Sequence, residues 1–444
     1  MTRGSIWLQL IQFALPMTVG LIFQQLYNTV DSIIVGQFVN KQALAAVGST
    51  SSIINTLVGF SAGLSTGSSV IISQRYGAKD EPGLRSAVST TLSLTFLLSV
   101  VLTLLSVFLV EPLLRMQATP EDVLPEASTY LRIYFLGLTG LLVYNMGSGI
   151  LRAVGDSRRP LYFLIFSAFL NTVLDLLFVI KFDMGVAGVA YATIIAQFIS
   201  ALLVLLVLTL EHAPYGIRWK ELRLHLPTLR KILSVGLPSG IQQALTSFSN
   251  VFVQSYINHF GSACMAGWSS CNKLDAFLTI PMQSIALAST TFVGQNYGAN
   301  QLPRAREGVK KAQILSVGIT LFLSAMIMIF ARPLSSLISP DADVLDYSEK
   351  FIHIMSPFYF AMCFNQTYAG ALRGIGKAKA PMFIMLFSFV LFRQIYLYVV
   401  KLLGNNLNFI ALAYPVGWVM CSLLLMVVYH RSELCRSETQ PANS

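Results

Sequence analysis

The sequence predicts an all-α polytopic membrane protein in which twelve transmembrane helices form two six-helix lobes related by a parallel repeat. Three observations predict this fold: the apolar composition, twelve apolar segments of membrane-spanning length, and short motifs that recur at a constant spacing. Of the 444 residues, 55% are apolar and 11% are charged, and the mean hydropathy is +0.65. Soluble proteins carry about 25% charged residues. This composition therefore excludes a cytosolic or secreted enzyme and a disordered scaffold.

The charged and reactive residues exclude further classes of function. The net charge of +10 is distributed over short gaps between apolar runs, so no basic stripe indicates binding to nucleic acid. The five cysteines show no CxxC or Cys/His spacing, and we expect neither a disulfide framework nor a transition-metal site. The sequence has no Walker loop, HExxH pair or Ser/His/Asp set, so we expect a protein that is not an enzyme and has no cofactor.

Twelve segments are apolar over about 19 residues or more, the length that crosses a bilayer. The first follows Arg3 without a small-residue cleavage pattern, so we interpret it as a retained span rather than a signal peptide. The second and eighth are rich in Ser, Thr and Gly, which is typical of helices that neighbouring helices shield from lipid. The expected spans are 9–38, 45–74, 86–110, 129–151, 160–181, 186–210, 231–260, 266–294, 309–331, 351–372, 380–403 and 407–429.

Lys and Arg residues are divided unequally between alternate loops. With the N-terminus inside, the cytoplasmic segments hold 21 of them and the outer loops hold 6. Cytoplasmic loops carry this excess in membrane proteins, so we expect both termini in the cytoplasm and the chain in the inner (plasma) membrane. The longest basic connection predicts an N-terminal lobe 1–211, a cytoplasmic linker 212–230, a C-terminal lobe 231–430 and a cytoplasmic tail 431–444.

Motifs of the first half recur in the second half at a spacing of 221 or 222 residues. Because each half has an even number of spans, both halves enter the membrane in the same direction, and the repeat is parallel. Such repeats are typical of secondary transporters and predict a substrate path between the halves. A duplicated scaffold without transport is the alternative. The recurring elements are Leu15-Pro16 and Leu237-Pro238, Gln74–Ala78 and Gln295–Ala299, Gly149–Gly155 and Gly370–Gly376, and Pro160 and Pro381.

Two acidic residues, Asp31 and Asp175, lie inside spans, where an ionisable side chain costs roughly 2.5–3.5 kcal/mol on insertion scales. Two carboxylates in a partly dry cavity favour binding of H⁺ or Na⁺, since either cation neutralises them, and Na⁺ prefers several oxygen ligands. We therefore expect an H⁺ or Na⁺ site; a purely structural role for the acids is the alternative. The residues of the H⁺ or Na⁺ site would be Asp31, Asn171, Asp175 and Thr193. The polar helix faces around this site would add Gln24, Tyr27, Asn28 and Gln197 to a substrate cavity.

The two acids have no counterparts in the second half. At the repeat spacing, Asp31 corresponds to Val253 and Asp175 corresponds to Tyr396. A requirement of the bundle itself would occur in both halves, so this asymmetry favours a functional role. Pro16 lies early in the first span, removes a helical hydrogen bond and permits a bend, so we expect it to act as a hinge.

Several motifs together resemble the multidrug and toxic compound extrusion (MATE) family. They are Gln25–Asp31 with Val35-Gly36, Ala43–Gly48, the Tyr-Gly-Ala pair after spans two and eight, and the Leu-Arg-x-x-Gly pair after spans four and ten. The resemblance covers nearly the whole chain and is nearest to the branch of DNA-damage-inducible F proteins. It implies a two-lobed antiporter that exports lipophilic organic cations in exchange for H⁺ or Na⁺ by alternating access. In that branch the coupling positions fall on Asp31, Asn171, Asp175 and Thr193, with the bend at Pro16.

One departure concerns the second half. The branch that resembles norfloxacin-type exporters keeps acids in spans seven and ten or eleven, whereas this chain has Gln242, Gln243 and Thr246 in span seven and Arg393 in span eleven. We therefore expect no second sodium site of that type, and we expect Arg393 to be a counter-charge for Asp275.

The sequence patterns also predict the partners of the protein and leave two alternative functions open. We expect small organic cations and the lipid bilayer as partners, no nucleic acid, and a monomer. A flippase for a lipid-linked saccharide and a non-transporting membrane sensor or assembly protein remain the alternatives.

Overall fold

The computed structural model describes residues 1–39, 41–117, 119–404 and 406–436, and this part of the chain consists of helices and loops without strands. The first half contains α1 (Ile6–Phe38), α2 (Lys41–Gly77), α3 (Glu81–Met116), α4 (Leu124–Leu136), α5 (Leu138–Ala153), α6 (Arg158–Leu176), the π-helix η1 (Leu177–Lys181) and α7 (Gly185–Leu210). The short 3₁₀ helix η2 (Trp219–Glu221) lies in the connection to the second half.

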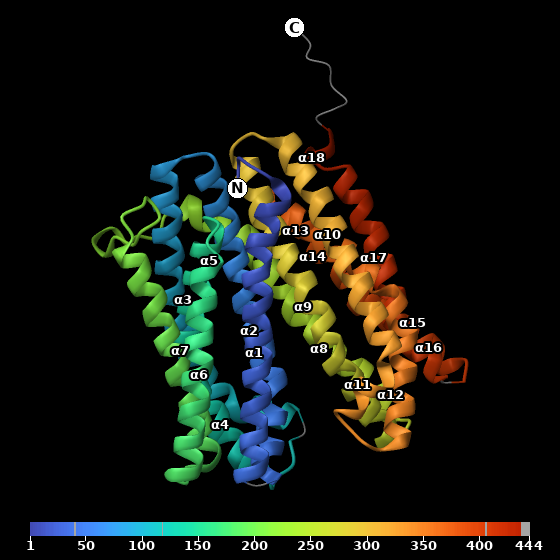
Figure 1. Ribbon diagram of the computed structural model, residues 1–444. Coiled ribbons are helices and arrows are strands. Elements are labelled where there is room, and N and C mark those ends of the chain that lie inside the picture. The colour runs from blue at the N-terminus through green and yellow to red at the C-terminus, as the bar shows by residue number, and fades with distance from the viewer. Residues whose placement is uncertain (40, 118, 405, 437–444) are drawn as a thin grey trace. The chain divides into compact units, whose positions relative to one another are not determined.

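The second half runs from α8 to α18 (Figure 1). It contains α8 (Leu226–Asn258), α9 (Ser262–Gly298), α10 (Leu302–Ile329), α11 (Ala331–Ser336), α12 (Ala342–Met355), the 3₁₀ helix η3 (Ser356–Phe358), α13 (Tyr359–Gly374), α14 (Lys379–Leu386), the π-helix η4 (Phe387–Phe392), α15 (Arg393–Leu402), α16 (Leu407–Ala411), α17 (Ala413–His430) and α18 (Glu433–Arg436).

These helices account for the twelve expected spans in order, and the all-α membrane fold is confirmed. In the described part of the chain, nine helical segments are long and apolar enough to cross a membrane, and α4 with α5, bent by 48°, makes a tenth. The remaining spans are α8, which is rich in polar side chains, and the α12–α13 segment, which η3 divides into helices of 14 and 16 residues. In α13, for example, the buried amide of Asn365 donates to the Trp418 carbonyl (3.2 Å) and accepts from Ser422 (3.0 Å). Neighbouring helices thus satisfy polar groups that lipid cannot.

The helices pack into two compact units, and their boundary lies inside helices. The first unit is Val19–Gly240, and the second unit is Met1–Thr18 together with Ile241–Ser444. The start of α1 therefore packs in the second unit, where Leu10 and Phe13 belong to a core cluster with Ile285 and Phe292. The boundary in α1 lies two residues after Pro16, and the boundary in α8 lies two residues after Pro238. The predicted lobe limits describe the sequence repeat and remain a prediction.

The repeat predicted from the sequence recurs in the packing of each unit. In the first unit, a Cβ atom on Gly149 would lie 2.4 Å from Ser65 Oγ and 2.9 Å from Ser69 Oγ. In the second unit, a Cβ atom on Gly370 would lie 2.8 Å from Thr290 Oγ1 and 2.9 Å from the Ala286 carbonyl oxygen. The glycines are 221 residues apart, and so are the residues that they contact. The same close approach of two helices is therefore built twice.

A second close contact joins α2 to the start of α8 within the first unit. A Cβ atom on Gly63 would lie 2.2 Å from the backbone nitrogen of Gly240, and one on Gly67 would lie 2.4 Å from the Cα of Gly236. Small residues let helix backbones approach each other in this way in membranes, where packing rather than water drives association. Every fourth residue lies on the same helical face, so the spacing of the two glycines in α2 matches this contact.

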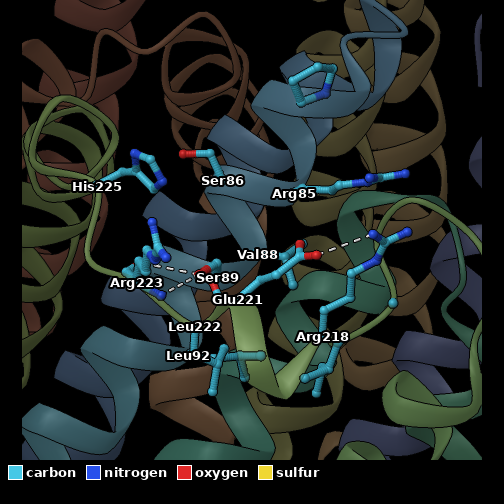
Figure 2. A pocket seen from close by; sticks show the side chains of 13 residues that line it. Arg85, Ser86, Val88, Ser89, Leu92, Arg218, Glu221, Leu222, Arg223 and His225 are labelled. Carbon is cyan, nitrogen blue, oxygen red and sulfur yellow. Dashed lines mark hydrogen bonds and ion pairs between the residues drawn. The ribbon is translucent and has the colours of Figure 1, made fainter.

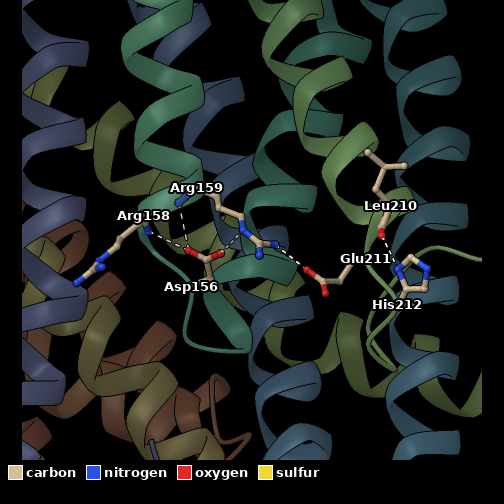
Figure 3. Close-up of polar contacts among 6 residues, drawn as sticks. All are labelled: Asp156, Arg158, Arg159, Leu210, Glu211 and His212. Carbon is tan, nitrogen blue, oxygen red and sulfur yellow. Dashed lines mark hydrogen bonds and ion pairs between the residues drawn. The ribbon is translucent and has the colours of Figure 1, made fainter.

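An ionic contact joins the loop before α6 to the end of α7 (Figure 3). Arg159 donates from Nη1 to Glu211 (2.7 Å) and lies 3.1 Å from Asp156, whose other oxygen accepts from the backbone of Arg158 and Arg159. The hydrogen bond from Arg159 holds the pKa of Glu211 below its ordinary value. The second unit has a corresponding ion pair between Lys377 and Glu433, which lowers the pKa of Glu433.

We expect Gly67→Ala to destabilise the protein, because the added methyl group meets backbone atoms that cannot move aside. The expected loss is about 1–3 kcal/mol, the usual cost of overpacking. The measurement is a thermal melt of the detergent-solubilised protein. Gly48→Ala in the same helix is the control, since a Cβ atom there would have no neighbour within 4 Å. Equal melting temperatures of the two variants would contradict the close-packing interpretation.

We expect Arg159→Gln to lower the melting temperature slightly at pH 7, since a partly exposed ion pair contributes about 0.5–1 kcal/mol. A carboxyl group with a lowered pKa stabilises the fold above its unfolded pKa, and this stabilisation is lost as the pH falls through the folded pKa. The difference between variant and wild type should therefore shrink only below about pH 4.5. Arg158→Gln is the control, because the Arg158 side chain is exposed. A difference that persists unchanged at low pH would exclude this ion pair as its cause.

Candidate functional site

Two carboxylates from different helices meet inside the first unit. Asp31 lies on α1 and is 8% exposed, and Asp175 lies on α6 and is fully buried. The two carboxyl groups lie near enough to interact directly. They do not form a hydrogen bond of normal geometry, since Asp31 Oδ1 and both oxygens of Asp175 are buried without a partner. The structure thus brings together the two acids that the sequence singles out.

The packing of α6 against α7 sets the position of Asn171 and Thr193. Ser167 of α6 donates to the carbonyl of Ala196 in α7 (2.9 Å). Because the two helices are antiparallel neighbours, the residue one turn after Ser167 in α6 lies opposite the residue about one turn before Ala196 in α7. Asn171 therefore lies at the level of Thr193, and both are nearly buried. The Thr193 hydroxyl donates to Val189 of its own helix (2.9 Å), which leaves its lone pairs free to accept.

The negative charges of Asp31 and Asp175 are not balanced by basic side chains. Neither acid has an ion pair with a basic residue in the part of the chain that the structure describes. Both polar atoms of the Asn171 amide also lack hydrogen-bond partners. A buried carboxylate without a partner is costly, and in practice it is neutralised by a proton or by a bound cation. Oxygen atoms of Asp31, Asn171, Asp175 and Thr193 fit either H⁺ or Na⁺.

Two tyrosines of α4, which the sequence did not single out, also lie at the site. Tyr130 lies within electrostatic range of Asp31 and Asp175, and Tyr134 accepts a hydrogen bond from Gln197 Nε2 (3.3 Å). The two rings stack with centroids 6.4 Å apart. Their spacing of four residues on one face of an apolar helix is a sequence pattern that could have indicated them.

The residues of α1 that were expected to line the cavity differ in how far they are buried. Tyr27 is half-buried beside Gln24 and within range of Asp31 and Tyr134. Asn28 is exposed. Pro16 lies inside α1, close to the boundary between the two units.

A π-helix begins two residues after Asp175. In η1 the hydrogen-bond ladder of α6 widens over Leu177–Lys181 before the chain turns into α7. Such segments are uncommon and are frequently found at functional sites. The π-helix of the second half, η4, does not occupy the equivalent position, because residues 166–171 correspond to it at the repeat spacing. The distortion beside Asp175 is therefore another feature that the halves do not share.

The second unit holds a buried cation where the sequence analysis expected an ion pair. Arg393 donates to Ser249 Oγ (2.7 Å) and Asn250 Oδ1 (3.0 Å), and its guanidinium lies 4.8 Å from the centre of the Tyr414 ring. The expected counter-charge role toward Asp275 is wrong, since no ion pair joins the two among the described residues. Asp275 lies beside Cys271 and Tyr359 instead. The π-helix η4 ends directly before Arg393, whose side chain reaches Ser249 and Asn250 of α8.

The described residues contain no group of three or more His, Cys, Asp or Glu side chains that could hold a metal ion. The first-unit site instead combines two carboxylates with amide and hydroxyl oxygens. This donor set suits H⁺ or a hard monovalent cation better than a transition metal.

A duplicated, all-helical membrane architecture with ionisable groups at depth is that of secondary transporters. The MatE family model matches residues 16–177 and again 238–399, so each half carries one copy that begins at a proline, Pro16 or Pro238. The chain belongs to the MatE family. The resemblance to multidrug and toxic compound extrusion proteins is thus confirmed, whereas the branch of DNA-damage-inducible F proteins remains a prediction.

Similar proteins support this assignment. The probable multidrug resistance protein YpnP of Bacillus subtilis is 32% identical over 398 residues, 88% of each chain. The probable multidrug resistance protein YoeA of the same organism is 29% identical over 395 residues, 87% of this chain and 85% of that one. The solved structure of a MOP superfamily transporter from Pyrococcus furiosus matches with a TM-score of 0.92 at 24% identity, covering 99% of this chain and 98% of that one, and shares the fold.

We expect Asp175→Asn to raise the melting temperature of the detergent-solubilised protein at alkaline pH without added Na⁺. The variant no longer buries a charge that lacks a partner, a penalty of several kcal/mol for an ion in a low dielectric. The measurement is a thermal melt at several pH values. Asp122→Asn, which removes an exposed acid, serves as the control and should change nothing. A destabilised Asp175→Asn variant at every pH would mean that the carboxylate is structural.

Proposed function

We propose that this protein is a multidrug efflux antiporter that exports lipophilic organic cations in exchange for H⁺ or Na⁺ by alternating access. The observation that carries the proposal is the pair of buried carboxylates, Asp31 and Asp175, without basic partners in the described chain. The names of the relatives, probable multidrug resistance proteins, support the efflux of drugs.

In the proposed cycle, the two carboxylates bind cargo and coupling ion in turn. The ionised acids attract a lipophilic cation that enters from the cytoplasm, with Gln24, Tyr27, Asn28 and Gln197 lining its cavity. From the outside, H⁺ or Na⁺ then binds Asp31 and Asp175, removes their negative charge and weakens the hold on the cargo. Transport follows because the ion binds the cargo-releasing state more tightly than the cargo-binding state. An ion with equal affinity for the two states would not shift the equilibrium between them.

In the proposed mechanism, a bend in the backbone of α1 couples binding of the ion to the shape of the cavity. Asn171 and Thr193 would supply further oxygen ligands to the ion. Bending at Pro16 would link occupancy to the shape of α1, because proline leaves the carbonyl four residues earlier without its helical partner. We infer a monomer in the inner (plasma) membrane with both termini in the cytoplasm, an orientation that the distribution of Lys and Arg supports.

The chemistry of the site favours cations over the alternative cargo, a lipid-linked saccharide. A flippase for such a lipid needs basic groups in its cavity to hold the diphosphate. The described first-unit site offers carboxylates, tyrosine hydroxyls and amides instead.

We expect Asp31→Asn and Asp175→Asn each to reduce gradient-driven drug transport in everted vesicles to below about a tenth of the wild-type rate. Asp122→Asn is the matched control and should transport normally. Gradient-driven transport at the full rate in both site variants would sink the site assignment.

The coupling ion is identified in the same vesicles by imposing the Na⁺ and pH gradients separately. Transport that follows one gradient assigns that ion. Transport that responds to neither would remove the antiport mechanism while leaving the family assignment intact.

A further inference from the structure

A basic pocket lies in the first unit, where the start of α3 meets the segment that follows α7 (Figure 2). Its volume is about 340 Å³. The polar lining comes from Arg85, Ser86 and Ser89 of α3 and from Arg218, Arg223 and His225 of the connecting segment. The pocket belongs neither to the carboxylate site nor to the proposed transport cycle.

The charges around this pocket leave it positive. Arg218 pairs with Glu221 at 3.3 Å, and Arg85 approaches Glu81 at 3.7 Å, both on exposed surface. Arg85 Nε is buried without a hydrogen-bond partner. No ion pair of the Arg223 side chain occurs among the residues that the structure describes. Three guanidinium groups thus face a lining that contains one carboxylate, Glu221.

Hydrogen bonds hold the wall of the pocket in place before any ligand binds. Ser89 Oγ accepts from the backbone nitrogen of Arg223 (2.7 Å) and donates to the Glu221 carbonyl (2.9 Å). The backbone nitrogen of His225 donates to Thr90 (3.2 Å), and Ser86 bonds to Thr228 (3.1 Å). A preformed site loses less entropy when it binds a ligand.

Aromatic and apolar residues place the pocket at the edge of the bilayer. Trp219 is 47% exposed and packs against Phe96 at 6.3 Å between ring centroids. Beyond Phe96, α3 exposes Leu97 and Val100, which suit lipid chains. Trp is enriched at membrane interfaces, where its apolar ring and polar N–H meet both environments. The basic lining therefore lies at the level of the lipid headgroups.

The second unit repeats this arrangement. A pocket of about 530 Å³ lies between α10 and the end of α17, and its lining includes Arg306, Lys310, Tyr429 and His430. Arg306 follows Arg85 by 221 residues, the repeat spacing, and both pockets lie where the third span of a half meets the segment after its sixth span. Unlike the acids of the ion site, this basic pocket recurs in both halves.

We propose that the two basic pockets bind the phosphate headgroups of anionic phospholipids. Guanidinium groups match phosphate oxygens in charge and in planar geometry. Basic pockets between transmembrane helices bind acidic headgroups by this chemistry. Val88, Leu92 and Leu222 form the apolar side of the first pocket. The proposal depends on membrane insertion and is independent of the transported substrate.

The test is native mass spectrometry of the full chain with added phosphatidylglycerol or phosphatidylcholine. Wild type should retain phosphatidylglycerol preferentially, and Arg85→Gln with Arg223→Gln should weaken its retention about ten-fold, since each basic residue near an anionic surface contributes several-fold in affinity. Lys220→Gln with Arg230→Gln removes the same charge from η2 and the start of α8, outside the pocket lining, and should retain the lipid. Arg306→Gln with Lys310→Gln should separately remove one bound lipid.

Several outcomes would overturn the proposal. Equal retention of the two lipids, or equal loss in the pocket variant and the Lys220/Arg230 control, would exclude a headgroup site. Complete displacement of phosphatidylglycerol by inorganic phosphate at millimolar concentration would assign the pocket to free phosphate instead.

A second measurement avoids arginine variants altogether. Phosphatidylglycerol with brominated acyl chains should quench the fluorescence of Trp219 more strongly than brominated phosphatidylcholine does. Trp219→Phe shows which part of the quenching comes from this residue. Identical quenching by the two lipids would contradict the proposal even if every arginine variant failed to fold.

Discussion

The absence of water in the bilayer governs this structure, because every backbone N–H and C=O group there needs a partner within the protein. Continuous helices meet this requirement over most of the chain. Three interruptions stand at informative places: Pro16 and Pro238 precede the two unit boundaries, and η1 follows Asp175. A break in the hydrogen-bond ladder is costly in lipid, and kinks in helices have identifiable causes such as proline and π-helical segments.

The duplication separates what the scaffold needs from what only one half carries. Gly149 and Gly370 make the same close contact with equivalent residues, and the basic pockets around Arg85 and Arg306 also recur. The unpartnered carboxylates of α1 and α6 do not recur. The scaffold is thus built twice, whereas this pair of buried carboxylates occurs in one half alone among the described residues.

The sequence predicted most of the fold because its signals are local. Hydropathy, loop charge and repeat spacing each act within a short stretch of chain, and they located the twelve helices and the pairing of Asp31 with Asp175. Three features escaped. Tyr130 joins the site through contact between spans distant in sequence, and Arg393 donates to Ser249 of α8 rather than pairing with Asp275. The packing of Met1–Thr18 with the second unit is likewise invisible to local patterns.

The division of α1 and α8 between the two units has a consequence for a chain cut in the segment between α7 and α8. The first fragment would keep residues 1–18, which complete the unit built by the second fragment. The second fragment would keep residues 226–240, which complete the unit built by the first. Each fragment thus carries a piece of its partner's core, and neither unit is whole when synthesised alone. Co-expressed fragments would therefore assemble by exchanging helices, and the linker peptide bond itself would be dispensable for that assembly.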